Sequence, residues 1–193
     1  TPTFGLNATA DRLGTVTIRN TNAKPTIRID DVSATRPTTG TTIYSFKVHL
    51  LNASTGRPTV TGVNTSVSWK TLRGTALPSL DYDSAAGMLS FAALTDSVKT
   101  ISVTVRGSTQ YHANPLRFSV NLTTDANVDT TVAIKKTVGV GTIASAVGAP
   151  KLAWIADTVA EGATGARNAI HFRASLLDSA GNPTTSRDPV VFV

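Results

Sequence analysis

The sequence predicts an all-β chain of tandem seven-stranded antiparallel β-sandwiches, and three observations lead to this fold class. Apolar and polar residues alternate along several stretches, which is the pattern of half-buried strands. Threonine occurs 32 times and glutamate once, a composition that favours strands over helices. The chain also repeats itself about every 125 residues, as arrays of modules do. The returning segments are Gly14–Ile18 at Gly139–Ile143, Pro25–Ile29 at Pro150–Trp154, Phe46–Leu51 at Phe172–Leu177 and Gly56–Pro58 at Gly181–Pro183.

The repeat divides the chain into three parts. Residues 25–149 are expected to form one complete sandwich, whose size suits a single hydrophobic core. Residues 1–24 are expected to supply the last strand or strands of a preceding repeat, and residues 150–193 the first strands of a following one. The segments between units, about Asn20–Lys24 and Ala144–Ala149, are short, so we expect stiff, closely stacked modules. Both ends fall within a repeat, so we expect a piece of a longer continuous chain rather than a subunit that polymerises through its ends.

Seven strands are expected in the complete unit. In the clearest of them, Leu116–Leu122, four apolar residues share one face and the polar residues between them share the other. The polar residues are Arg117, Ser119 and Asn121. In the last strand, Gly139 and Gly141 predict a β-bulge. Turn-rich segments separate the strands, and two antiparallel sheets packed face to face would bury the apolar faces. The expected strands are Ile27–Val32, Ile43–Leu50, Val67–Trp69, Gly87–Phe91, Ile101–Arg106, Leu116–Leu122 and Val132–Ile143.

The shared period-two phase also predicts which side chains lie inside the sandwich. The predicted core consists of Tyr44, Phe46, Val48, Trp69, Leu89, Phe91, Ile101, Val103, Phe118 and Val120.

Composition excludes several classes of function. There is no cysteine, and therefore no disulfide framework, thiolate metal site or cysteine nucleophile. No apolar run approaches the length of a membrane span, so none is expected in this chain. The net charge is +6, but the cations are dispersed, with no run longer than Lys135–Lys136, so a nucleic-acid partner is not expected.

Nothing in the chain predicts an enzyme. The single glutamate, Glu161, makes paired carboxylates for glycoside chemistry improbable, and there is no Gly-x-Ser-x-Gly motif. Of the three histidines, His49 and His171 fall on the outward phase of equivalent strands and are expected at the surface, while His112 lies in a loop. Both tryptophans, Trp69 and Trp154, are expected in cores rather than stacked on sugar rings. No catalytic or cofactor-binding residue is therefore predicted.

The segment Thr71–Phe91 resembles the signature of Calx-beta repeats. Gly-Thr-Ala occurs at 74–76, Asp-Tyr at 81–82 and Gly-x-Leu-x-Phe at 87–91. Residues 99–105 resemble the family's next strand, Lys-Thr-Ile-x-Val-x-Val, and residues 141–143 are its closing Gly-Thr-Ile. Residues 159–165 resemble the segment that opens a repeat of the family. The resemblance implies an immunoglobulin-like sandwich of the Calx-beta type. This family occurs in regulatory domains of exchangers, in matrix and adhesion proteins, and in long bacterial surface proteins.

The resemblance also implies a calcium site at one end of the sandwich, built from four groups of acids. In this sequence Arg36 stands where the first glutamate is expected, and Asp81 survives in its loop. The segment Gly107–Pro115, which should be acidic, has no acid, and the junction acids are replaced by Arg19, Asn20 and Asn22, and by Ala144–Ala146. We expect no metal in residues 25–149, and we expect Asp81 to accept hydrogen bonds from backbone N–H groups of its turn. Calcium remains possible in sister repeats, because Asp157 and Glu161 are kept.

These observations favour a structural or adhesive repeat module of a long extracellular protein on a bacterial cell surface. Stacked sandwiches would build a stalk, fibre or matrix, and the partners would be neighbouring repeats or other copies of the protein. One alternative is a binding module for polyanionic surface glycans, which salt-sensitive binding to acidic polysaccharide would distinguish. The other is a calcium-binding regulatory domain.

Overall fold

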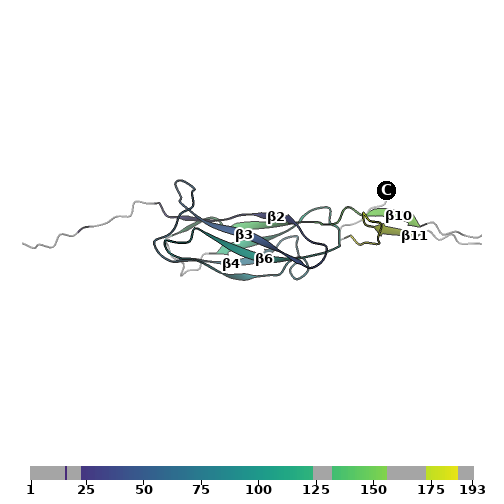
Figure 1. Ribbon diagram of the computed structural model, residues 1–193, viewed down its shortest axis with the longest axis horizontal. Coiled ribbons are helices and arrows are strands. Elements are labelled where there is room, and N and C mark those ends of the chain that lie inside the picture. Colours follow the sequence, from purple (N-terminus) through teal and green to yellow (C-terminus); the bar gives the residue numbers. More distant parts are fainter. Residues whose placement is uncertain (1–15, 17–22, 124–131, 156–172, 187–193) are drawn as a thin grey trace, which may run out of the picture.

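The computed structural model describes residues 16, 23–123, 132–155 and 173–186. Within these residues, nine strands form two packed sheets, and a hairpin follows at one end (Figure 1). One sheet has the strand order β6-β3-β1-β8 and the other β2-β9-β7-β4-β5. The nine strands are β1 (Thr26–Ile29), β2 (Val32–Thr35), β3 (Thr41–Leu51), β4 (Thr65–Arg73), β5 (Ala86–Phe91), β6 (Val98–Arg106), β7 (Leu116–Thr123), β8 (Ala133–Lys136) and β9 (Val138–Ala144). The described residues contain no helix long and apolar enough to cross a membrane.

The nine strands correspond to the seven expected passes of the chain, because the first and the last pass each change sheet. The first pass breaks at Asp30–Asp31, between β1 and β2, and the last breaks at Thr137, between β8 and β9. The two passes run side by side in the same direction, so β1–β8 and β2–β9 pair in parallel. The other pairings within the sandwich are antiparallel, as expected. The two broken passes therefore tie one side of the sandwich together.

The prediction of a β-bulge at Gly139 and Gly141 is wrong. The register between β7 and β9 runs without a shift from Leu116–Ile143 to Asn121–Val138. The two glycines instead permit close packing: a Cβ at position 141 would lie 2.5 Å from the Phe118 ring, and one at position 139 would lie 2.8 Å from the carbonyl oxygen of Asp30. The register shift lies between β1 and β8.

The core between the sheets contains the predicted residues. Eight of the ten are at most 1% exposed, and the other two, Trp69 and Leu89, are partly buried against them. Phe118 lies at the centre of an aromatic cluster, with its ring centroid 4.4 Å from that of Tyr82, 5.8 Å from Phe46 and 6.3 Å from Tyr44. The period-two phase of the sequence thus places the strands correctly against each other.

The chain leaves β9 and forms the hairpin of β10 (Lys151–Ile155) and β11 (Arg173–Leu177). Lys151 pairs with Leu177 in this hairpin, as Thr26 pairs with Leu51 between β1 and β3. We call the end of the sandwich beside this hairpin the downstream end; it carries loops 36–40, 74–85 and 107–115. The opposite, upstream end carries loops 52–64 and 92–97.

Candidate functional site at the downstream end

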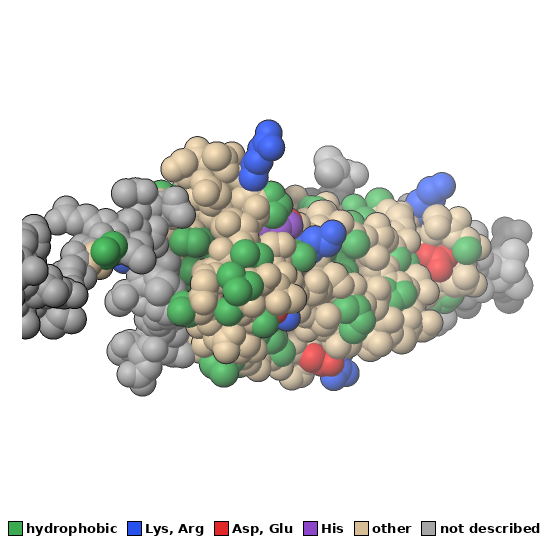
Figure 2. Space-filling model, turned by 60° about the vertical axis from the view of Figure 1, so that its left-hand side comes forward, with side chains coloured by type: hydrophobic (Ala, Val, Ile, Leu, Met, Phe, Trp, Pro, Cys, Tyr) green, Lys and Arg blue, Asp and Glu red, His purple; other side chains and the backbone are tan. Residues whose placement is uncertain are grey.

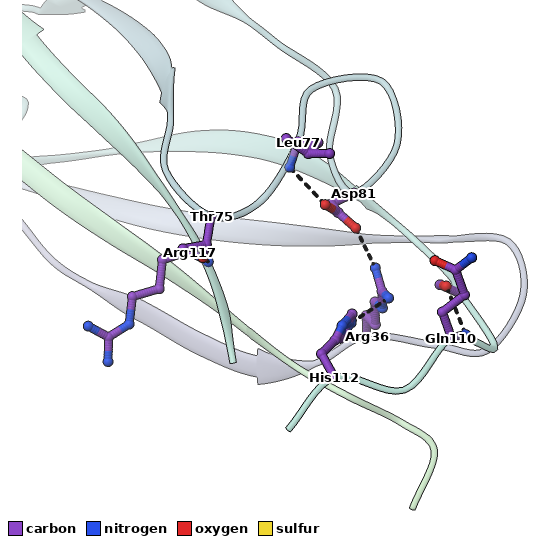
Figure 3. Close-up of polar contacts among 8 residues, drawn as sticks. Arg36, Thr75, Leu77, Asp81, Gln110, His112 and Arg117 are labelled. Atoms are coloured by element: carbon purple, nitrogen blue, oxygen red, sulfur yellow. Dashed lines mark hydrogen bonds and ion pairs between the residues drawn. The ribbon is translucent and has the colours of Figure 1, made fainter. Parts of the chain in front are cut away.

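Arg36 is buried at the downstream end, which is where the family resemblance places a metal site. It follows β2, and its backbone N–H donates to the carbonyl of Ala144, at the end of β9, over 3.2 Å. Its side chain is 0% exposed, and its Nη1 lies 2.9 Å from Oδ1 of Asp81 (Figure 3). A guanidinium withdrawn this far from water requires a charged partner, and Asp81 supplies one.

Asp81 is positioned by its own loop. Its Oδ2 accepts a hydrogen bond from the backbone N–H of Leu77 over 2.7 Å, which confirms the predicted capping of a turn. Its backbone N–H donates to the carbonyl of Leu77, and its carbonyl accepts from Arg106 at the end of β6, both over 2.8 Å. Each carboxylate oxygen of Asp81 therefore already has a donor from the chain.

His112 completes the cluster from the third loop. Its Nε2 lies 2.6 Å from Nη2 of Arg36, and the residue is 4% exposed. A guanidinium has donors only, so Nε2 of His112 accepts, and the ring is neutral with its proton on Nδ1. The sequence identified Arg36 and Asp81 through the resemblance but did not predict that His112 joins them. The available signal was its place in the segment where the acids are missing.

The loop that holds His112 is also tied to its neighbours through the backbone. Gly107 donates to the carbonyl of Gly40 over 2.8 Å, and Ser108 donates to the carbonyl of Pro37 over 3.0 Å. Next to His112, Tyr111 forms a β-bridge with Ser186, which follows the β10–β11 hairpin. The buried cluster therefore connects the exit of β9 to the loop that touches the next segment of the chain.

Tyr82 links the cluster to the core. It follows Asp81 and stacks on Phe118 with an interplanar angle of 14°. Burial raises the pKa of the Tyr82 hydroxyl, and burial also raises the pKa of Tyr44, whose hydroxyl donates to the carbonyl of Ala34 beside Arg36. Both phenols are neutral at physiological pH, so neither adds a charge beside Arg36 and Asp81.

The residues of the downstream end do not fit calcium. Calcium takes six to eight oxygen ligands, several of them from carboxylates. Here each carboxylate oxygen of Asp81 already accepts a hydrogen bond, from Arg36 or Leu77, and Asp83 is paired with Arg106 at 2.7 Å. Loops 36–40 and 107–115 carry no acid. The described residues contain no group of three His, Cys, Asp or Glu able to hold a metal ion. That residues 25–149 bind no calcium stays a prediction, and Asp157 and Glu161 lie outside the described residues.

The other singled-out residues lie away from this cluster. His49 is less exposed than expected: its side chain is 23% exposed, and Nε2 lies 2.8 Å from Oδ2 of Asp30. Trp69 is partly buried and covers Gly87, whose Cβ would lie 3.2 Å from the indole nitrogen. His171 and the side chain of Trp154 lie outside the described residues.

Comparison with known proteins identifies the fold. No protein-family model matches the sequence, and no curated protein matches it. Among solved structures, the apo-form Calx CBD1 domain matches with a TM-score of 0.51 and 15% identity, over 64% of this chain and 98% of that domain. The chain has the Calx-beta fold. At this identity the likeness extends to the fold alone.

Two further Calx domains match this chain with lower TM-scores. The Calx CBD2 domain has a TM-score of 0.49 and 15% identity, over 66% of this chain and 91% of that domain. The calcium binding domain CBD12 of CALX1.1 has a TM-score of 0.44 and 18% identity, over 53% of this chain and 38% of that protein.

Proposed function

We propose that this chain is a structural module of a long extracellular protein of the bacterial cell surface, in which Calx-beta sandwiches follow one another as a stiff stalk, fibre or matrix. In this proposal residues 25–149 are one complete repeat, and residues 1–24 and 150–193 belong to its two neighbours. The partners are neighbouring repeats and other copies of the protein, and the module performs no catalysis.

The observation that carries the proposal is the geometry of the β10–β11 hairpin. Its register reproduces that of β1–β3 residue by residue, and the turn that follows β11 resembles the turn that follows β3 but is one residue shorter. The backbone N–H of Asp178 donates to the carbonyl of Asn182, as the backbone N–H of Asn52 donates to the carbonyl of Arg57, both over 2.8 Å. The equivalent glycines, Gly181 and Gly56, have positive φ angles of 87° and 67°. Such agreement supports a second copy of the same fold beginning at about residue 150.

The junction supports stiffness. Residues 145–150 are all that separate β9 from β10, a length too short for a flexible tether. The Tyr111–Ser186 bridge adds a direct contact across the junction. Because the downstream end is held by Arg36, Asp81 and His112, this stiffness does not depend on a metal ion.

Spin labels at Ser102→Cys in β6 and Ala180→Cys beyond β11 test this proposal in the full chain, whose lack of native cysteine leaves each label at a single site. Both positions are exposed. We expect a narrow distribution of distances between the labels, and the same distribution in calcium and in chelator. A broad distribution would contradict a stiff junction, because weakly joined domains move relative to one another.

A second candidate function, binding of polyanionic surface glycans, is favoured by unbalanced surface charge. Every aspartate in the described part of the sandwich lies against a cation, in the pairs Asp30–Arg28, Asp31–Lys136, Asp81–Arg36, Asp83–Arg106 and Asp96–Lys99. By contrast, Lys47, Lys70 and Arg117 are exposed on β3, β4 and β7 and form no ion pair with the described residues. Binding to alginate that weakens with added salt, and weakens again in Lys70→Gln/Arg117→Gln, would support this function.

A further inference from the structure

Leu94 combines two unfavourable features at the upstream end. Its backbone has a φ of 59°, in the left-handed region that side chains other than those of Gly, Asn and Asp rarely adopt. Its side chain is 76% exposed, so an apolar group is held in water at the tip of a turn. The turn is closed by Asp96, whose Oδ2 accepts from the backbone N–H of Ala92 over 2.7 Å. Strained residues of this kind cluster at functional sites, which makes Leu94 a candidate for a functional contact.

Two exposed valines lie beside Leu94. The backbone N–H of Leu94 donates to the carbonyl of Thr61 over 2.8 Å, and the Thr61 hydroxyl donates to the carbonyl of Val63 over 2.7 Å. Val60 is 39% exposed and Val63 is 47% exposed. We call Val60, Val63 and Leu94 the upstream patch. Figure 2 turns this end of the sandwich toward the viewer and shows hydrophobic side chains gathered on it.

The contact at the downstream end indicates which part of a neighbouring repeat would face the upstream patch. Beyond β11, Pro183 bridges to Leu177 as Pro58 bridges to Leu51. The backbone N–H of Thr184 then donates to the carbonyl of Leu176 over 2.9 Å, as the backbone N–H of Thr59 donates to the carbonyl of Leu50 over 3.0 Å. Two residues further, Ser186 occupies the place that Thr61 has in the complete sandwich, and Ser186 bridges to Tyr111 in loop 107–115. The downstream loop of one unit thus reaches the segment of the next unit that carries the upstream patch here.

We propose that the upstream patch is the docking surface for the downstream loop of a preceding copy of this sandwich, the loop equivalent to residues 107–115. The inference rests on the proposed function for the existence of that copy. The loop suits an apolar patch, because it contains no Asp, Glu, Lys or Arg, and its one imidazole, that of His112, is turned inward to Arg36. Docking would therefore remove Leu94 from water without burying a charge of the loop.

A chain with one repeat added tests the proposal: residues 1–149 followed directly by residues 25–193, which keeps the natural spacing. Spin labels at Ser102→Cys of the first copy and Ser45→Cys of the second report the geometry of the new junction. We expect a narrow distance distribution, broadened about twofold by Leu94→Asn in the second copy as the docked contact is lost. In the 193-residue chain the same substitution should leave the melting temperature unchanged or raise it, because asparagine tolerates the left-handed conformation.

Ile43→Thr is the matched control, since Ile43 is 55% exposed on the outward face of β3, away from the upstream patch. It should leave the junction distribution unchanged. A narrow distribution that Leu94→Asn does not alter would overturn the docking surface while leaving the proposed function standing. A distribution already broad in the unsubstituted two-repeat chain would overturn both.

Discussion

Arg36 carries a full charge although none of its side chain is exposed. Its contribution to stability therefore depends on the groups that pair with this charge. Asp81 and His112 take two of its nitrogens, while its Nε has no hydrogen-bond partner among the described residues. Transferring a charge from water to the protein interior costs several kcal/mol, and the attraction of a paired carboxylate only roughly offsets this cost. The cluster therefore fixes geometry more than it adds net stability.

Asp81→Asn should destabilise the sandwich by about 3–5 kcal/mol, because it leaves the buried guanidinium of Arg36 without a countercharge. Urea unfolding of the full chain, followed by tryptophan fluorescence, measures the change. The double variant Arg36→Met/Asp81→Leu removes both charges and should recover most of the loss. A loss below about 1 kcal/mol in Asp81→Asn would show that the pair is solvated rather than buried.

The buried phenols predict how stability changes at high pH. Burial raises the pKa of Tyr82 and of Tyr44 above the value of an exposed tyrosine. Above about pH 10 the unfolded chain loses these protons before the folded chain does. Their stabilising contribution is therefore complete below that pH and is lost as pH rises through the raised pKa.

Tyr82→Phe keeps the stacking on Phe118 and removes the ionisable group. Urea midpoints measured between pH 9 and pH 11 should fall less steeply in this variant than in the parent chain. Equal slopes would contradict the raised pKa.

At the scale of the element, alternation in the sequence predicts the strands that have one face in the core. The strands β3, β6 and β7 lie as predicted, because a period of two reports which face of a strand is buried. It does not report which strand lies alongside, so neither the breaks at Asp30–Asp31 and Thr137 nor the parallel pairings could be predicted. The role of the glycines in β9 could not be predicted for the same reason, since only the packed core reveals how close Gly141 lies to the Phe118 ring.

Gly141→Ala should destabilise the sandwich by about 1–3 kcal/mol, because the added methyl group would overlap the Phe118 ring in a closely packed core. Gly62→Ala is the matched control: a Cβ at position 62 meets nothing within 4 Å, and the substitution should be nearly neutral. Thermal unfolding of both variants, followed by circular dichroism, provides the comparison. If Gly141→Ala proves as harmless as Gly62→Ala, the glycine is not required by packing.

At the scale of the whole molecule, the sequence predicts the sandwich more fully than the downstream end. The repeat is visible because matched segments return in order, and the register of β10–β11 agrees with it. The placement of Arg36 opposite Asp81 could be inferred only from a resemblance, and the contact with His112 joins residues 76 positions apart, which no local pattern specifies. Long-range polar contacts of this kind depend on the assembled loops.

The chemistry of the downstream end leads to a prediction for the full chain in calcium. A ligand that binds the folded state raises the melting temperature by mass action, in proportion to the logarithm of its concentration above Kd. Because the guanidinium of Arg36 is bound to Oδ1 of Asp81 and the N–H of Leu77 to its Oδ2, millimolar calcium should leave the unfolding transition of the complete sandwich where it is in chelator. Magnesium at equal ionic strength controls for the general effect of salt. A rise with calcium alone that persists in Asp81→Asn would place a site in the sister repeats, where Asp157 and Glu161 are kept, whereas a rise abolished by Asp81→Asn would show that Asp81 binds the ion despite Arg36.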